Sequence, residues 1–210
     1  EMSVAVLMIK PAIDAGRVAN GDPQEENTLV TQHVELTITK CVEMFAEAIP
    51  TSVLQTYAIL SDNGDVSKQA VFSVFISAGC IAFTSSTISM DMDTDPKKRL
   101  MVPNFYGYFP DKNRMVVFIL MNLMTTAHVL MKALACGLML RLSAIWFWVY
   151  LCGDVGFFFF YKLVRGDIRH WMNLGGLLGL IVTFLIRLVV KIIVDFTLIV
   201  HFRLPLDLGG

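Results

Sequence analysis

The stretch CVEMFAEAIPTSVLQTYAIL, residues 41–60, has the length of a membrane-spanning helix but contains two glutamates and a proline. A helix of about 20 apolar residues crosses the roughly 30 Å hydrocarbon core of a bilayer. On the insertion scale a carboxylate near the bilayer centre costs on the order of 3 kcal/mol, whereas each Val, Leu, Ile or Phe returns only about 0.5 kcal/mol. Glu43 and Glu47 therefore outweigh the seven such apolar residues of the stretch. We expect this helix to turn its acidic side toward other helices or a watery cavity.

The polar residues of this helix recur every four positions. On an α-helix that spacing drifts by only about 40° per step, so it predicts one slowly winding polar face. The face contains Glu35, Thr39, Glu43, Glu47, Thr51 and Gln55. Pro50 removes one backbone hydrogen bond and predicts a kink. Backbone groups freed in this way are tolerated in a membrane only where protein or water satisfies them, which again predicts an inward face.

The composition of the whole chain is that of an integral membrane protein. Hydrophobic residues make up 55% of the chain and charged residues 17%, whereas charged residues make up roughly a quarter of a soluble domain. The formal net charge is -1, from 17 basic and 18 acidic residues. There is no basic excess to attract nucleic acid, so nucleic-acid binding is disfavoured and membrane lipids are the expected partners.

The hydrophobic pattern predicts an all-α fold, a polytopic bundle of about five transmembrane helices. The predicted spans are residues 34–60, 69–90, 115–140, 143–164 and 172–201. Residues 1–33 read as a polar loop that follows an earlier helix, and 204–210 as the start of a further segment. The expected transmembrane region is 34–203, and the chain reads as a fragment of a larger protein with flanking domains or other subunits as further partners.

The lysines and arginines between the predicted spans are distributed unevenly. Cytoplasmic loops retain an excess of these residues. With five crossings, one side receives ten of them: Lys10, Arg17, Lys97, Lys98, Arg99, Lys112, Arg114, Lys162, Arg165 and Arg169. The other side receives three: Lys68, Arg141 and Arg203. This asymmetry predicts that the loops 91–114 and 162–171 are cytoplasmic.

A second charged face is predicted on span 172–201. Polar and small residues recur there at four-residue steps: Gly179, Thr183, Arg187, Lys191 and Asp195. Lys191 and Asp195 are placed to pair along their own helix. An acidic and a basic face on different helices of one bundle either pair structurally or line a hydrophilic crevice. Both alternatives predict Glu43 or Glu47 near Arg187 or Lys191.

Other polar residues within the spans are candidates for pairing or packing. Lys132 of span 115–140 and Asp154 of span 143–164 form a second candidate ion pair. His128 is interpreted as a hydrogen-bonded packing residue, because no metal-ligand spacing accompanies it. Close helix packing is predicted where glycines are spaced for it: Gly175, Gly176 and Gly179. The four single cysteines are interpreted as small buried hydrophobes: Cys41, Cys80, Cys136 and Cys152.

The phrase EAIPTSVLQTYAIL, residues 47–60, resembles one segment of the XK-related family of membrane proteins, whose members include caspase-activated phospholipid scramblases. The resemblance covers residues 41–65 and rests on Glu47, Pro50 and Gln55, followed by Tyr57 and Leu60. It implies a helical bundle in which buried charges offer a path for lipid headgroups. The chain shows no caspase site, and five spans cover only part of an XK-related bundle. The ending DFTLIVHFRLPLDLGG resembles multi-pass segments of algal and other protist membrane proteins that have no assigned activity.

Three classes of function follow from these patterns. The first is a multi-pass membrane protein with a polar crevice that scrambles or transports lipids. The second is an ion channel or proton-coupled transporter, in which a desolvated Glu43 or Glu47 cycles a proton. The third is a membrane anchor or assembly module of a larger protein. An enzyme is disfavoured because catalytic and phosphate-binding motifs are lacking, and the patterns call for no cofactor or metal.

Overall fold

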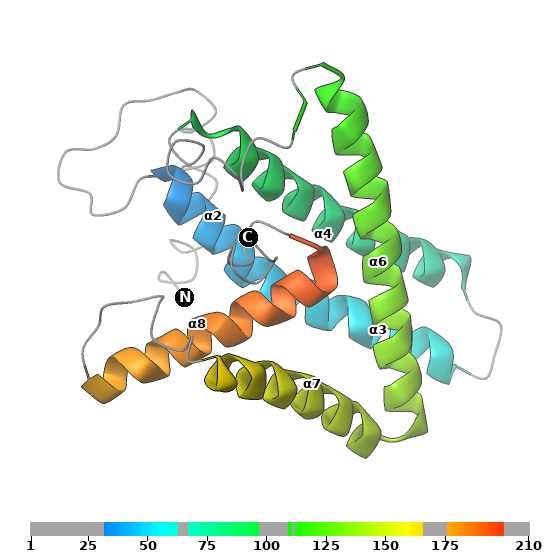
Figure 1. Ribbon diagram of the computed structural model, residues 1–210. Coiled ribbons are helices and arrows are strands. Elements are labelled where there is room, and N and C mark those ends of the chain that lie inside the picture. The colour runs from blue at the N-terminus through cyan, green and yellow to red at the C-terminus, as the bar shows by residue number, and fades with distance from the viewer. Residues whose placement is uncertain (1–31, 63–66, 97–108, 111, 166–175, 200–210) are drawn as a thin grey trace, which may run out of the picture.

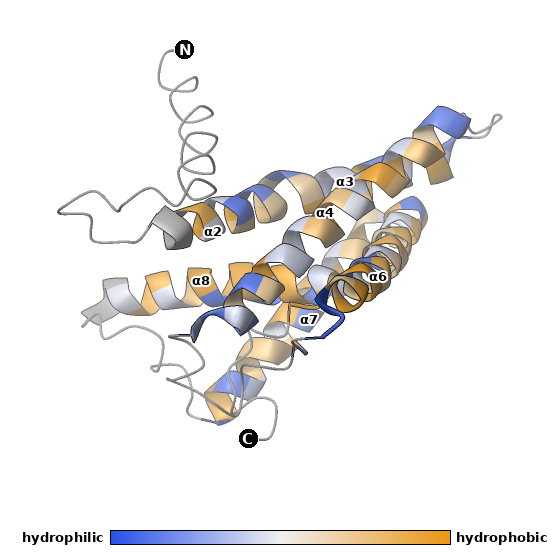
Figure 2. Ribbon diagram, turned by 90° about the horizontal axis from the view of Figure 1, so that it is seen from above, coloured by the Kyte–Doolittle hydropathy of each residue, from blue (hydrophilic) through white to orange (hydrophobic). Residues whose placement is uncertain are grey.

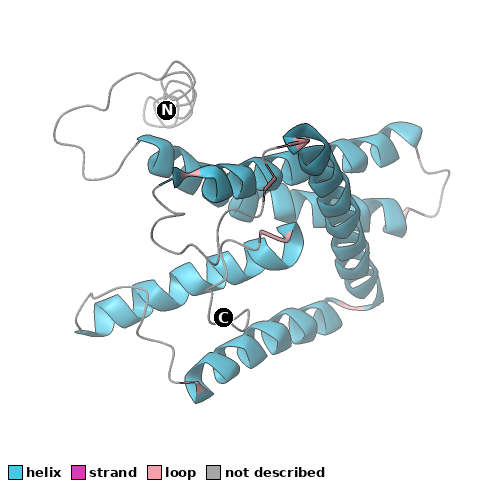
Figure 3. Cartoon of the chain, turned by 45° about the horizontal axis from the view of Figure 1, so that its top comes forward, coloured by secondary structure: helices cyan, strands magenta, loops and turns pink. Residues whose placement is uncertain are grey.

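The computed structural model describes residues 32–62, 67–96, 109–110, 112–165 and 176–199, and these are almost entirely helical (Figure 3). Within these ranges no residue is in a strand, which confirms the all-α prediction for this part of the chain. Residues 1–31 of the predicted polar segment 1–33, most of the loop 91–114 and the ending 204–210 lie outside the described residues, and the last two residues of 1–33 begin the first described helix.

The helices of the structure follow the predicted spans closely (Figure 1). The first predicted span is a helical run in three parts, α2 (Gln32–Glu43), a π-helical turn η1 (Met44–Ala48) and α3 (Ile49–Ser61). The other spans correspond to α4 (Lys68–Thr94), α6 (Arg114–Leu142), α7 (Ala144–Val164) and α8 (Gly176–Thr197). Pro50 is the second residue of α3, next to the π-helical turn, where the regular backbone hydrogen bonding is already altered.

Three helices, α4, α6 and α7, are long and apolar enough to cross a membrane. The prediction of five crossings is therefore supported for three of its spans. The run from α2 to α3 is divided by the π-helical turn and holds two glutamates on its outer side. In α8 three charged side chains, those of Arg187, Lys191 and Asp195, fall within nine residues. In the hydropathy colouring of Figure 2, α8 is mostly hydrophobic and is interrupted by hydrophilic residues.

The longest helix, α6, packs against α3, α4, α7 and α8 and so holds the described bundle together. It approaches α3 closely at Gly137, where an added Cβ would lie 3.2 Å from side-chain carbons of Thr56 and Leu60. Small residues of this kind let the backbones of membrane helices come together. Of the glycines predicted to pack closely, Gly179 of α8 is buried and Gly175 lies outside the described residues, so close packing at 175–179 stays a prediction.

Several hydroxyl side chains of α3 and α4 are buried in the bundle. Ser52 and Thr56 of α3 are buried, as are Ser85, Ser86 and Ser89 of α4. The first two donate their hydroxyls to backbone carbonyls of their own helix, at 2.8 Å in each case. Because such bonds satisfy the hydroxyl within one helix, they allow Ser52 and Thr56 in an apolar interior without an unpaired group.

Two hydrogen bonds between the helices of the bundle and the segments next to them fix the ends of α6 and α4. Ser143 has an extended backbone between α6 and α7, and its hydroxyl accepts a hydrogen bond from the Ile145 amide at 3.2 Å. This cap ends α6 and begins α7 within one residue. At the other end of α6, the fully buried carboxylate of Asp93 accepts a hydrogen bond from the Phe109 amide at 2.9 Å, tying the end of α4 to the segment that follows it.

Candidate functional site: a charged cavity between α6, α7 and α8

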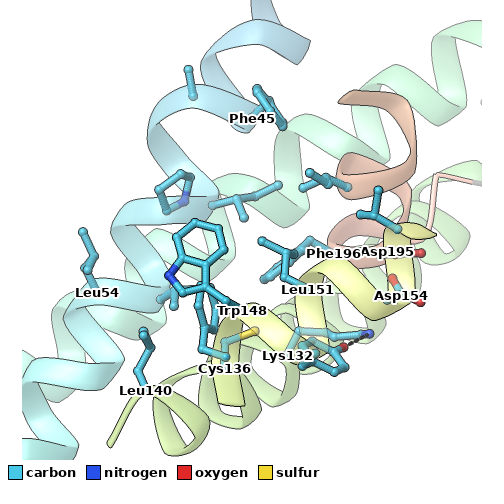
Figure 4. Close-up of a pocket in the computed structure, with 18 residues that line it drawn as sticks. Phe45, Leu54, Lys132, Cys136, Leu140, Trp148, Leu151, Asp154, Asp195 and Phe196 are labelled. Carbon is cyan, nitrogen blue, oxygen red and sulfur yellow. Dashed lines mark hydrogen bonds between the residues drawn. The ribbon is translucent and has the colours of Figure 1, made fainter. Parts of the chain in front are cut away.

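A cavity of about 550 Å³ lies between the η1–α3 segment and helices α6, α7 and α8. Its volume falls within the roughly 300–1,000 Å³ of pockets that enclose a small ligand. The walls are predominantly apolar, with Leu54 of α3 and Leu140 of α6 toward one end in Figure 4. Lys132, Asp154 and Asp195 lie toward the other end, each from a different helix. The cavity therefore changes from apolar to charged along its length.

The ammonium of Lys191 joins the two carboxylates at the charged end. It forms ion pairs with Asp154, at 2.7 Å, and with Asp195 one turn along α8. The Lys191 side chain is only 14% exposed, whereas that of Asp154 is 43% exposed. The structure thus makes the predicted pair of Lys191 with Asp195 and adds Asp154 of α7 to it. One ammonium serves two carboxylates and links α7 to α8.

Lys132 of α6 completes this group of charges without joining the ion pairs. Its ammonium donates a hydrogen bond to the hydroxyl of Tyr150 at 3.2 Å. It is close enough to Asp154 and Asp195 for electrostatic attraction. Lys132 and Asp154 therefore lie near each other but do not form the predicted ion pair, because Asp154 is paired with Lys191. We call Lys132, Asp154, Lys191 and Asp195 the charge cluster.

His128 fixes α6 against the end of α8 beside the charge cluster. Its Nε2 lies 2.8 Å from the backbone oxygen of Asp195, and since that oxygen only accepts, the ring nitrogen donates. The interpretation of His128 as a hydrogen-bonded packing residue is consistent with this contact. Among the described residues no group of three or more His, Cys, Asp and Glu side chains is placed to hold a metal ion.

Helix α7 forms a wall of the cavity and packs mainly against α6, with few contacts to α8. None of its apolar membrane-spanning window is buried by the rest of the described chain. It meets α8 through the stacked rings of Phe159 and Phe184, whose centroids are 4.0 Å apart, and through the Lys191 ion pair. The Lys191 ammonium also lies 5.7 Å from the centroid of the Phe158 ring. These few contacts determine how far α7 stands from α8.

The structure places the acidic face of the first helix differently from the prediction. Glu43, Glu47 and Thr51 are exposed on the outer side of the α2–η1–α3 run. Within the described residues neither glutamate forms an ion pair with Arg187 or Lys191. The reason is that buried apolar and small side chains, among them Met44, Ile49 and Val53, fill the inward side of this run. The four-residue spacing did place Glu43, Glu47 and Thr51 on one face, but these three residues point outward.

The remaining predicted residues divide between the cavity and the interior. Pro50 lines the cavity and is itself exposed. Gln55 is half-buried and accepts a hydrogen bond from the Ser77 hydroxyl at 3.3 Å, linking α3 to α4. Arg187 is 5% exposed and Gly179 is buried, so the polar face of α8 points inward as expected. The C-terminal part of this face, Lys191 and Asp195, belongs to the charge cluster.

Tyr150 is the functional candidate that the sequence did not indicate. It lies in the aromatic run WFWVY, which resembles the aromatic belts found at membrane surfaces. The signal that could have identified it is its spacing, since Tyr150 precedes Asp154 by one helical turn and shares its face of α7. That face meets Lys132 and Lys191 through the side chains of Tyr150 and Asp154.

The chain has the helices of a membrane protein and a charged cavity. Its helices include three that are long and apolar enough for a membrane protein, and four of its charged residues gather at one end of an apolar cavity. Comparison with protein-family models, with curated proteins and with solved structures finds no match to it.

Proposed function

We propose that this chain is a polytopic membrane protein that moves lipids, with the charge cluster serving as the path for their headgroups. The single observation that carries the proposal is the position of the charge cluster, at one end of an otherwise apolar cavity between α6, α7 and α8. A lipid has the same division into a charged and an apolar part. Charges inside a membrane are expensive, so a cluster retained there is a functional-site hypothesis by default.

The weak attachment of α7 supports movement through this site. An acyl chain that enters the cavity has to pass between helices, and α7 is the wall with the fewest contacts to its neighbours. Lipid scrambling of the kind that the XK-related resemblance implies is the most concrete version of the proposal. The residues assigned to the path differ from those of the resemblance, since the charge cluster replaces Glu47 and Gln55.

The test is lipid flip-flop in liposomes that contain the purified full chain. Reporter phospholipids labelled in the headgroup are placed in both leaflets, and a membrane-impermeant reductant measures exchange. We expect exchange by the wild type and at least a tenfold slower rate for Lys191→Met. Glu47→Gln is the matched control, because it also alters a charged residue but lies on the outer face. Equal rates for Lys191→Met and wild type, or no exchange by correctly folded wild type, would overturn the proposal.

A second candidate function is ion or proton transport, and it rests on the sharing of one ammonium by two carboxylates. A cation or a proton that displaces Lys191 from Asp154 or Asp195 would find an acidic site already formed. The same liposomes, loaded with a pH-sensitive dye and given an ion gradient, measure this flux. Ion flux without lipid exchange favours this candidate. Silence in both assays leaves the charge cluster with a structural role in an anchor or assembly module.

A further inference from the structure

The cavity lining carries one positive charge, that of Lys132, and two negative charges, those of Asp154 and Asp195. Asp154 and Asp195 share the single ammonium of Lys191, which itself does not line the cavity, so their side of the charged end has a surplus of negative charge. Lys132 forms no ion pair with either carboxylate, since its ammonium donates to the neutral hydroxyl of Tyr150, and its positive charge is therefore also available to a ligand. A ligand that presents one negative and one positive group complements Lys132 and the carboxylates at once.

The size and shape of the cavity restrict the apolar part of such a ligand. A methylene group fills about as much space as a water molecule in the liquid, roughly 30 Å³. A cavity of about 550 Å³ therefore has room for one acyl chain and not for two. The apolar walls lead from the charged end to Leu54 and Leu140 (Figure 4). The cavity is therefore suited to one chain that lies along these walls with its head at the charge cluster.

We propose that the cavity binds a single-chain zwitterionic phospholipid of the lysophosphatidylcholine type. Its phosphate accepts hydrogen bonds from the Lys132 ammonium and the Tyr150 hydroxyl, and its trimethylammonium lies against Asp154, the more exposed carboxylate. The ring of Tyr150 also lines the cavity, and aromatic faces attract quaternary ammonium groups. This inference rests on the site of the proposed function, but it concerns binding rather than movement.

The headgroup assignment is tested by measuring dissociation constants for three amphiphiles that have a hydrocarbon tail of the same length. The purified full chain in a non-ionic detergent is titrated with lysophosphatidylcholine, with lysophosphatidate, which lacks the ammonium, and with an alkyl trimethylammonium, which lacks the phosphate. We expect lysophosphatidylcholine to bind at least tenfold more tightly than either of the others. If lysophosphatidate or the alkyl trimethylammonium binds equally well or more tightly, the zwitterion proposal is wrong.

Variants assign the two charges separately. Lys132→Met should weaken lysophosphatidylcholine binding at least tenfold and leave the alkyl trimethylammonium unchanged. Asp154→Asn should weaken both and leave lysophosphatidate unchanged or tighter, since the nearby negative charge is lost. Lysophosphatidylcholine constants that do not change in either variant contradict the placement of its headgroup.

A third variant tests the cavity without altering a charge. Ala46→Trp places a bulky ring at an exposed position of the lining, so the chain should fold while its binding of lysophosphatidylcholine falls at least tenfold. Val42→Trp, one turn earlier and outside the lining, is the matched control and should bind as the wild type does. Equal binding by both variants excludes this cavity. Binding that persists in protein without flip-flop activity removes the proposed movement alone, and flip-flop without binding removes only this inference.

Discussion

At the scale of single residues, Lys191 is the side chain on which the site depends most. It is mostly buried, it satisfies two carboxylates at once, and it joins α7 to α8. Removing either the ammonium or the carboxylate of a buried ion pair is destabilising, because it leaves the other charge buried without a compensating charge. The pairing therefore links the stability of the bundle to the integrity of the cavity.

We predict that Lys191→Met destabilises the protein by about 2–3 kcal/mol. This is below the roughly 3–5 kcal/mol expected for breaking a fully buried pair, since Asp154 keeps access to its surroundings. Thermal unfolding in detergent, followed by tryptophan fluorescence, measures the change. Adding Asp195→Asn to Lys191→Met should recover part of the loss, because it removes one of the two uncompensated carboxylates. A double variant whose losses are simply additive would contradict the ion-pair network.

Tyr150 gives a second prediction of the same kind. Tyr150→Phe removes the hydroxyl that accepts from Lys132 and should lower stability by about 1.5–3 kcal/mol, the range for a hydrogen bond to a charged group. Tyr161→Phe is the matched control, since Tyr161 also accepts a hydrogen bond from a cation, Arg165, but at an exposed position. The same unfolding measurement should show almost no loss there. Equal losses at both positions would contradict the assignment of Tyr150 to the charge cluster.

At the scale of helices, the contact of α6 with α3 depends on the missing side chain of Gly137. An added Cβ there would be 3.3 Å from the backbone nitrogen of Tyr57, and backbone atoms do not move aside as the end of a flexible side chain does. The neighbouring buried positions, Ala133 and Thr56, are small as well. Close approach of the two helices sets the position of α3 and with it one wall of the cavity.

We predict that Gly137→Leu destabilises the bundle by about 1–3 kcal/mol through overpacking. Gly79→Leu is the control, because an added Cβ at Gly79 of α4 meets no atom within 4 Å. Chemical unfolding of the two variants in the same detergent compares them directly. A loss for Gly137→Leu no larger than that for Gly79→Leu would show that α6 and α3 do not approach as closely as described.

The positions of the helices could be predicted from the sequence, but the direction of a helix face could not. Long apolar runs located α4, α6 and α7 to within a few residues, because helix length follows bilayer thickness. The spacing of Glu43 and Glu47 identified a single face, yet spacing does not say which side of a helix the rest of the bundle covers. Tyr150 was missed because aromatic residues near a membrane surface have a second common explanation.

At the scale of the whole molecule, the three long apolar helices predict how the chain crosses the bilayer. The 29 residues of α6 extend about 43 Å at 1.5 Å per residue, more than the roughly 30 Å of hydrocarbon. Its two ends should therefore lie on opposite sides. Positive charges predict that the end near Arg114 is cytoplasmic.

Thiol labelling of intact cells or sealed vesicles checks this topology. In a background without the native cysteines, Asn113→Cys and Leu142→Cys place single thiols at exposed positions near the two ends of α6. We expect an impermeant maleimide added outside cells to label Leu142→Cys and to label Asn113→Cys only after permeabilisation. Labelling of both thiols from the same side would show that α6 does not span the membrane.

The central claim is that α7 and α8 meet across the charged cavity while the protein is in a membrane. The most direct measurement is crosslinking between Phe159→Cys and Phe184→Cys, introduced together in the background without native cysteines, with a short bifunctional thiol reagent. The native rings are stacked with centroids 4.0 Å apart, so we predict efficient crosslinking within one chain. Phe160→Cys paired with Phe184→Cys is the control, since Phe160 is exposed one position further along α7. Crosslinking no better than that of the control pair would contradict the placement of α7 and, with it, the cavity.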